Sequence, residues 1–463
     1  MARSISAGET SHWSGVAALG SLVALSSSVL LGAQALAGGL AVREQSVFAQ
    51  GASFAGAAAG GDLSSSFWNP AAMATAGYGL TTESHFSLIV ADYDVRAESV
   101  SVLPGSLMVP STTAVNDVSK IDPIAAVGAS YAAWRINDAF VLGLSISAPF
   151  GSQNDASDPA WSGQYHYRAS QLLTVNVNPI ISYQISPTLS IGAGPQIQYM
   201  LLKVKANPSG ALAPPQRRSV VEGDDIGVGY TAGVLWQPNP ATSIGLGFRS
   251  AVSHTIEGDA SVRGGMLTTG VGLGTVAFEP VNFSAKLETP EIVTLSARQS
   301  VNPTMRLLAT VEWTNWSRLD EVDFLATDIG GIAARPFAPG DSINVLDFHW
   351  DDGWFFALGG EWDYSSRLTL RAGAAYEISP IRHATQRKIN VADSDRIWLS
   401  AGASYAATES MSFDVAYSHI IFDDAPIDAL TNSPGSPTTP VRRFVGRAHQ
   451  AADIVSVAMK SKW

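Results

Sequence analysis

Residues 189–201 read LSIGAGPQIQYML, and this stretch decides the fold class of the chain. Its alternate positions are apolar at Leu189, Ile191, Ala193, Ile197, Tyr199 and Leu201, and small or polar at Ser190, Gly192, Gly194, Gln196 and Gln198. A repeat of two residues is the side-chain repeat of a β-strand. Pro195 lacks an amide donor and would break a helix, so the stretch is not a membrane-spanning helix. We interpret it as a strand with one apolar face and one small, polar face.

The same alternation recurs along the chain, in the segments 140–148, 243–249, 367–376 and 397–405. A water-soluble β-sandwich, the main alternative, would bury the apolar face and place Lys and Glu on the other. Here the second face carries mostly Gly, Ser, Thr and Gln with scattered Arg. That composition is typical of the lumen of a membrane β-barrel, whose apolar face meets lipid.

The lengths of the joints favour a barrel. Short joints rich in Pro, Asn, Asp and Ser alternate with long ones, as in bacterial outer-membrane barrels with periplasmic turns and outer loops. A sheet in lipid satisfies its backbone only by closing. The pattern predicts an all-β, 14-stranded antiparallel transmembrane barrel, with strands near 79–95, 120–134, 138–150, 167–186, 188–205, 224–237, 242–257, 281–300, 304–318, 353–364, 367–378, 395–407, 410–422 and 449–463.

The composition excludes several classes of function. The 463 residues include 28 Lys and Arg against 40 Asp and Glu, a net charge of -12. Nucleic-acid binding needs a clustered positive face, which this balance argues against. The absence of Cys excludes disulfides, Cys-ligated metals and Cys nucleophiles. A hydrophobic content of 46% with 12 Trp excludes a disordered chain.

The N-terminus has the features of an export signal. No charged residue occurs between Thr10 and Val42, and the short apolar run from Val16 to Leu31 is followed by the small-x-small triplet at 35–37. A membrane anchor is the alternative, but this run is shorter than the ~20 residues that span a bilayer. We expect residues 1–37 to be a cleaved signal peptide.

Aromatic residues lie where a periplasmic girdle is expected. Trp134, Tyr183, Trp236 and Trp362 are all close to short joints, and the chain ends on Trp463. A terminal aromatic residue is the feature that the outer-membrane assembly machinery reads. An ordinary edge strand is the alternative. These residues predict location in the bacterial cell outer membrane.

Several motifs together resemble the FadL-type transporters of long-chain fatty acids and hydrocarbons. They are the Ala- and Gly-rich run 51–61, the triplet Asn69, Pro70 and Ala71, the segments 227–250, 287–291 and 375–380, and the run 393–400. The resemblance covers the mature chain. It implies an N-terminal hatch, residues 38–77, that plugs a barrel formed by residues 78–463.

The family resemblance also implies a mode of transport. Hydrophobic cargo would be captured in an apolar groove between outer loops, pass the hatch through a buried pocket, and leave sideways near the third strand. The implied partners are a hydrophobic small molecule, outer-membrane lipid and lipopolysaccharide, and the assembly machinery, with the protein acting as a monomer. No nucleic acid is expected.

Candidate residues for these parts follow from the sequence. Pro149, Phe150 and Gly151 are the expected lateral gate, because Pro cannot donate to a ladder. The alternative is a strand that simply ends at its loop. Candidates for substrate binding are Trp161, Tyr165, Met266, Leu267, Leu273 and Phe278 in the outer loops, and the inward-facing Arg249 and Arg298. Loop residues packing on one another, and arginines pairing with wall or hatch acids such as Glu312, are the alternatives.

Enzyme motifs do not hold in their context. The dinucleotide-like run 227–232 lies in a predicted strand with no helix after it. His349 lies near Asp351 and Asp352 in a predicted outer loop, where solvation is more common than a metal site. We therefore expect no enzyme, cofactor or metal. Long-chain fatty acids are the expected cargo, and aromatic hydrocarbon uptake, a non-selective porin and an adhesin are the alternatives.

Overall fold

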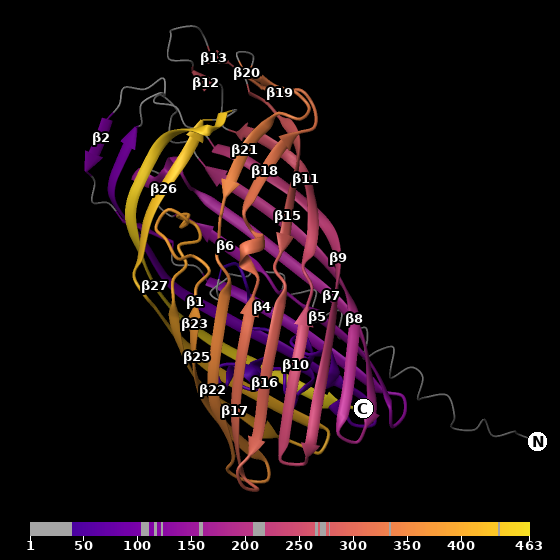
Figure 1. Ribbon diagram of the computed structural model, residues 1–463. Coiled ribbons are helices and arrows are strands. Elements are labelled where there is room, and N and C mark those ends of the chain that lie inside the picture. The colour runs from indigo at the N-terminus through magenta and orange to yellow at the C-terminus, as the bar shows by residue number, and fades with distance from the viewer. Residues whose placement is uncertain are drawn as a thin grey trace, which may run out of the picture.

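The computed structural model describes residues 39–102, 111–114, 118–121, 124–156, 161–206, 218–263, 267–268, 275–276, 278–332, 335–433 and 436–463. None of the helices in these ranges is long and apolar enough to span a membrane. The predicted signal peptide lies outside the described residues. Figure 1 shows a tall barrel with the hatch inside its lower half.

The wall is a closed antiparallel barrel of 14 strands, as the alternation predicts. Its members, in pairing order, are β1 (Gly79–Val102), β4 (Ile124–Arg135), β5 and β6 (Phe140–Ser147, Gly151–Asp155), β7 (Ala169–Ser186), β8 (Leu189–Ala206), β9 (Arg218–Asn239), β10 and β11 (Thr242–Arg249, Val252–Arg263), β16 and β15 (Ile292–Ser300, Val281–Thr289), β17 and β18 (Met305–Thr314, Glu321–Ala326), β22 and β21 (Gly353–Asp363, Ser342–Asp347), β23 (Leu368–Ile378), β24 (Arg396–Ala406), β25 and β26 (Met411–Phe422, Ala425–Ser433) and β27 (Ser436–Lys462). β27 pairs with β1 from Lys462–Thr81 to Arg442–Val102 and closes the barrel.

Short elements complete the outer end of the molecule (Figure 1). They are β2 (Ser111–Ala114) and β3 (Val118–Lys120) beside β1, the turn η3 (Ser162–Tyr165), and the two small sheets made by β12 (Leu267–Thr268) with β13 (Thr275–Val276) and by β14 (Phe278–Glu279), β19 (Gly330–Ile332) and β20 (Arg335–Phe337). The turn η4 (Trp316–Arg318) lies lower, between β17 and β18. The C-terminus lies at the opposite end, beside the short turns.

The hatch is a compact coil of three short helical turns. They are α2 (Val47–Gln50), η1 (Leu63–Phe67) and η2 (Pro70–Thr75). Each begins at a polar cap, Ser46, Asp62 or Asn69, whose side chain accepts a backbone N–H of the first turn. The caps explain why an Ala- and Gly-rich segment, which has little side-chain mass to pack, still takes one conformation.

The strand at residues 189–201 has the predicted faces. Ile191 and Ile197 are exposed on the outside of β8, whereas Gln196 and Gln198 are buried in the lumen. The predicted girdle residues Trp134, Tyr183, Trp236, Trp362 and Trp463 are likewise exposed near the short turns. Because the outside of the lower wall is apolar and its inside polar, this part of the wall is built to face lipid.

Four predicted strands are interrupted. The segment 138–150 does not end at its loop but continues as β6 after a break at 148–150. The segments 242–257 and 281–300 break at 250–251 and 290–291, and 304–318 ends as a strand at Thr314, before η4. The alternation of apolar and polar residues along one strand does not show where its pairing is interrupted, because the interruption depends on the neighbouring strands.

The interruptions invert the two faces of the wall. In β10, Leu246 is exposed to lipid, but in β11, Ile256 points into the lumen and is fully buried. The same change occurs from Leu295 in β16 to Phe283 in β15. A shift of one residue in a strand moves its apolar set to the other face. On this side of the barrel the upper wall therefore turns apolar side chains into the lumen, while the lower wall turns small and polar side chains inward.

Candidate transport path and lateral gate

The third strand of the wall has a break in its pairing at Pro149. The ladder between β4 and β5 stops at Ser130–Ile146, and the described residues of β4 beyond it pair only with β1. On the other side, β5 and β6 both pair with β7, and Thr174 bridges the interruption by accepting the N–H of Phe150 at 2.9 Å. The wall is thus open on one edge only.

The height of the break follows from the register. Gly151 pairs with Leu173, which in turn pairs with Leu201. The next outward-facing pair above is Gln171 with Lys203. The break therefore lies at the upper boundary of the apolar outer surface, where an opening would face lipid.

The first residues of the hatch cover this break. Ala41 forms an antiparallel bridge with Phe150. Val42 N–H donates to the Pro149 carbonyl at 2.9 Å, and Gly151 N–H donates to the Leu40 carbonyl at 3.0 Å. Hatch residues 40–42 therefore act as a short strand in place of β4. Pro149, Phe150 and Gly151 are the residues expected at the gate, and they lie at the break; passage of cargo here stays a prediction.

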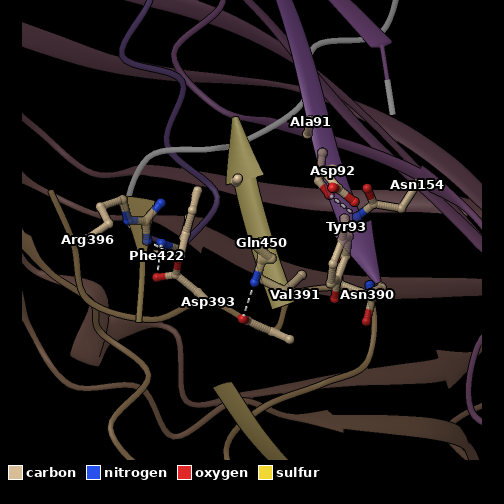
Figure 2. Close-up of a pocket in the computed structure, with 14 residues that line it drawn as sticks. Ala91, Asp92, Tyr93, Asn154, Asn390, Val391, Asp393, Arg396, Phe422 and Gln450 are labelled. Atoms are coloured by element: carbon tan, nitrogen blue, oxygen red, sulfur yellow. Dashed lines mark hydrogen bonds and ion pairs between the residues drawn. The ribbon is translucent and has the colours of Figure 1, made fainter. Parts of the chain in front are cut away.

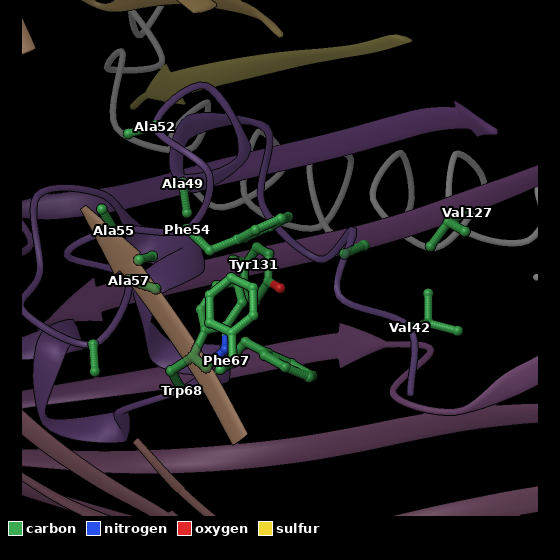
Figure 3. Packing of buried hydrophobic residues seen from close by; sticks show 14 of the residues in the cluster. Val42, Ala49, Ala52, Phe54, Ala55, Ala57, Phe67, Trp68, Val127 and Tyr131 are labelled. Atoms are coloured by element: carbon green, nitrogen blue, oxygen red, sulfur yellow. The ribbon is translucent and has the colours of Figure 1, made fainter. Parts of the chain in front are cut away.

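Gln45 connects the hatch to both sides of the break. Its side-chain amide donates to the Ala148 carbonyl at 2.8 Å and accepts the Ala148 N–H at 3.1 Å, which copies a backbone pair. The Tyr131 hydroxyl of β4 donates to the Gln45 carbonyl at 2.8 Å. Val42 of the hatch and Val127 of β4 belong to one buried cluster (Figure 3). The closed state of the break thus depends on hatch residues 40–45.

The lower wall is shaped to receive the hatch. Glycines on its inner face leave room for hatch backbone: a Cβ on Gly245 would lie 1.8 Å from the Ala58 carbonyl oxygen, and one on Gly247 1.8 Å from that of Trp68. Asn69 of the triplet donates to the carbonyls of Ala58 and Val234, both at 2.9 Å. The small residues of the inner face are therefore explained by close backbone contact.

We expect Gly245→Ala to destabilise the seated hatch, because the new methyl group would overlap the Ala58 carbonyl. Overpacking of this kind costs about 1–3 kcal/mol. Gly360→Ala is the matched control, since its Cβ would meet its nearest neighbour at 3.5 Å. Limited proteolysis of folded protein would show faster hatch cleavage in Gly245→Ala alone. Equal cleavage of both variants would contradict the close contact.

A buried ionic network fixes the upper part of the hatch. Arg43 donates to Glu312 of β17 at 2.8 Å and to Glu377 of β23 at 3.1 Å, and its guanidinium lies 3.8 Å from the Phe355 ring centroid. Trp398 also donates to Glu377 at 2.9 Å. All three charged side chains are buried, so the arrangement needs each of its members.

Arg43→Met is expected to destabilise the protein by about 3–5 kcal/mol, because it leaves Glu312 and Glu377 buried without their cation. Arg318→Met is the control: Arg318 pairs with Glu288 and Glu291 but is about one-third exposed, and such pairs contribute roughly 0–1 kcal/mol. Urea unfolding in lipid vesicles measures the free energy of unfolding of both variants. Similar losses in the two variants would contradict the role given to Arg43.

A polar cavity adjoins the start of the hatch (Figure 2). It contains about 450 Å³ of unfilled space, part of it open to solvent, and is lined by Gly39, Asn154, Asp393 and Arg396 among others. Gly39 N–H donates to an Asp393 carboxylate oxygen at 3.0 Å, and Asp393 also pairs with Arg396. The run 393–400 therefore links this cavity to the hatch.

Comparisons with known proteins identify the family of this chain. Residues 28–463 match the family described as outer membrane protein transport protein (OMPP1/FadL/TodX). The chain belongs to this family. It is 28% identical over 319 residues to the long-chain fatty acid transport protein of Escherichia coli O6:H1, covering 62% of this chain and 67% of that protein.

Two solved structures share the fold. A FadL homologue of Pseudomonas aeruginosa has a TM-score of 0.77 at 22% identity, covering 92% of this chain and 99% of the other. The toluene transporter TodX of Pseudomonas putida has a TM-score of 0.62 at 16% identity, covering 92% and 99%. This member of the family is an outer-membrane protein that transports hydrophobic molecules, and the family consists of transporters and channels.

The two arginine candidates lie beside the hatch in the lower lumen of this FadL-family barrel. Arg249 donates to the Phe67 carbonyl at 3.0 Å and to the Gln196 side chain. Arg298 donates to Glu361 at 2.6 Å. Arg298 thus has a wall acid, which was the alternative to a cargo carboxylate, whereas Arg249 is held by a hatch carbonyl and a wall amide and not by an acid. Binding of cargo by either arginine stays a prediction.

The loop candidates are placed only in part. Trp161 is buried in a cluster with Tyr93, Tyr167 and Phe444, apart from the cluster that contains Phe150. The side chains of Tyr165, Leu267 and Phe278, and the whole of Met266 and Leu273, lie outside the described residues. Their role in a capture groove is therefore still a prediction.

Within the described part of the chain, two groups of side chains have the spacing of metal ligands. In the buried group, Asp62, Glu83 and His85, the Lys460 ammonium already lies 2.7 Å from Glu83 and supplies the positive charge. The other group, Glu321, Asp347 and His349, lies on the outer surface of the wall at the lower ends of β18 and β21. A hydrogen bond to Asp320 raises the pKa of His349 there. Neither group is assigned a metal.

Proposed function

We propose that this protein takes up long-chain fatty acids by passive transport, and that the cargo leaves the barrel sideways through the break at Pro149. One observation carries the proposal. The apolar lining of the upper lumen is continuous with Leu40 and Phe150, so it ends at a break in the wall that the hatch covers.

The upper lumen supports the first part of the path. Ile256, Phe283 and Phe324 from three neighbouring strands belong to the same buried cluster as Phe150. A fatty acyl chain of about sixteen carbons gains roughly 12 kcal/mol on leaving water, at ~0.8 kcal/mol per methylene. An apolar lining is favourable for such a chain, whereas a water-filled pore offers it nothing.

The hatch supports the second part. Its residues 40–45 close the break through a few hydrogen bonds, without a full strand ladder. Displacement of this short segment would therefore open the wall while the larger part of the hatch, held by the lower-wall glycines, stays in place. The path thus leads to lipid and not through the lower lumen.

Two alternatives remain for the cargo. The fold is shared with a toluene transporter, so an aromatic hydrocarbon is the second candidate. The cavity beside the start of the hatch is lined in part by the amides Asn154, Asn390 and Gln450, which suit a polar head better than a plain hydrocarbon does. A non-selective porin is disfavoured because the hatch fills the lower lumen.

The test is uptake by bacteria that lack their own transporters of this family and express this protein. We expect import of radiolabelled oleic acid well above that of cells with an empty vector, and a smaller gain for toluene. A gain for toluene alone would replace the fatty acid by an aromatic hydrocarbon. No gain for either compound would contradict the proposal.

A further inference from the structure

Four aromatic rings form a continuous row in the upper lumen, which we call the aromatic row: Phe348, Trp350, Trp316 and Phe150. Neighbouring ring centroids are 5.2, 5.4 and 5.8 Å apart, and each contact is edge to face. The rings come from the segment between β21 and β22, from η4 and from the break itself. The row therefore runs along the level at which the wall strands are interrupted and ends at Phe150.

Trp350 has a buried donor that is left unsatisfied by the residues that the structure describes. Its side chain is 3% exposed, and its indole Nε1–H has no nitrogen or oxygen acceptor within hydrogen-bonding distance among the described residues. Buried donors are nearly always paired, and an orphan calls for an explanation such as an absent partner. Here the surroundings are the apolar cluster of the path.

The backbone beside Trp350 is held in an unusual conformation. His349 has a φ of +47°, which non-glycine residues rarely adopt. The N–H groups of Phe348 and His349 both donate to the Asp320 carbonyl, at 2.7 and 3.0 Å. Such conformations cluster at binding sites, where the surrounding structure maintains them. They also position the two rings on either side of His349.

The hatch lies against two rings of the row, Trp350 and Trp316. A Cβ on Gly39 would lie 2.9 Å from the Trp350 ring and 3.0 Å from the Trp316 ring. Leu40 follows in the same apolar cluster. The start of the hatch therefore lies against the aromatic row, at the place where a molecule on its way to the break would contact it.

We propose that the aromatic row is a binding subsite for a hydrophobic molecule with a hydrogen-bond acceptor, whose oxygen accepts the Trp350 Nε1–H while its chain lies along the rings toward Phe150. This deepens the proposed function and rests on it. A site built to donate a hydrogen bond rejects an analogue that lacks the acceptor. The row thus selects an acid over a hydrocarbon of equal length.

The test compares two ligands and four proteins, namely the wild type and the variants Trp350→Phe, Trp350→His and Trp313→Phe. Detergent-solubilised full-length chains would bind oleic acid or 1-octadecene, with equilibrium dialysis as the measurement. We expect Trp350→Phe, which keeps a ring and loses the donor, to raise the Kd of the acid about tenfold and leave that of the hydrocarbon unchanged. Trp313→Phe is the matched control, because the Trp313 Nε1–H is already paired with Asp352 at 2.9 Å.

A second variant separates the hydrogen bond from packing. Trp350→His retains a ring donor and is expected to recover part of the lost affinity for the acid. An unchanged Kd in Trp350→Phe, or equal losses for both ligands, would overturn the subsite. Acid binding with this dependence but without import in cells would contradict the proposed transport and support the subsite. Import of oleic acid that does not depend on Trp350 would support the proposed transport and contradict the subsite.

Discussion

Deletion of residues 39–77 is expected to convert this protein into an open, water-filled pore. The hatch fills the lower lumen, and the wall around it is lined by small and polar side chains such as Gln196, Gln198 and Thr310. Without the hatch this lining becomes hydrated. We expect the single-channel conductance in planar bilayers to rise by about tenfold or more.

The wall itself should survive this deletion, because its 14 strands close through their own ladders, from β1–β4 to β27–β1. Heat-dependent mobility on gels, which reports an intact barrel, provides the control. A full-length protein that already conducts as strongly as the deletion variant would contradict the plugged lumen and favour a porin. Low conductance that returns when the hatch is added back would support the plugged lumen.

The barrel was predictable because its signal is local. The alternation over 189–201 can be recognised without knowledge of the neighbouring strands. The same pattern, with apolar side chains facing lipid and small or polar ones facing the lumen, recurs along the lower wall. The hatch was predictable from its resemblance to known motifs. The close contact of the hatch with Gly245 and Gly247 was indicated in the sequence only by the small side chains of the inner face.

The inverted upper wall was not predictable from alternation. The segment 281–300 has an apolar residue at nearly every odd position, yet Phe283 faces the lumen and Leu295 faces lipid. The apolar residues change face at Pro290. A proline indicates that the strand is interrupted, but it does not indicate which face is apolar on either side. Polar partners such as Lys286 and Glu288 above it, against Thr294 and Ser296 below, were the available signal.

The closing contacts of the break were also hidden in the sequence. Gln45 and Ala148 are 103 positions apart, and Arg43 and Glu312 are 269 apart. Pro149 showed that a ladder fails, but not that hatch residues 40–42 replace it. The aromatic row was missed for the same reason, since Phe150, Trp316 and Trp350 meet only in the folded chain.

The most direct test of the account fixes the hatch to the break. Ala41 and Phe150 are bridge partners, whose Cα atoms lie about 4.5–5.5 Å apart in antiparallel pairs, and a disulfide spans that distance. The chain has no cysteine of its own, so the pair Ala41→Cys and Phe150→Cys would be the only one. Ala297→Cys with Ala309→Cys, on two wall strands that already pair, is the control.

Oleic acid uptake by cells carrying these variants would be measured under oxidising conditions and again after a reductant. We expect the disulfide between residues 41 and 150 to lower uptake at least about tenfold, reduction to restore it, and the control pair to change nothing. Uptake by the oxidised 41–150 variant at the rate of its reduced form would contradict the lateral gate.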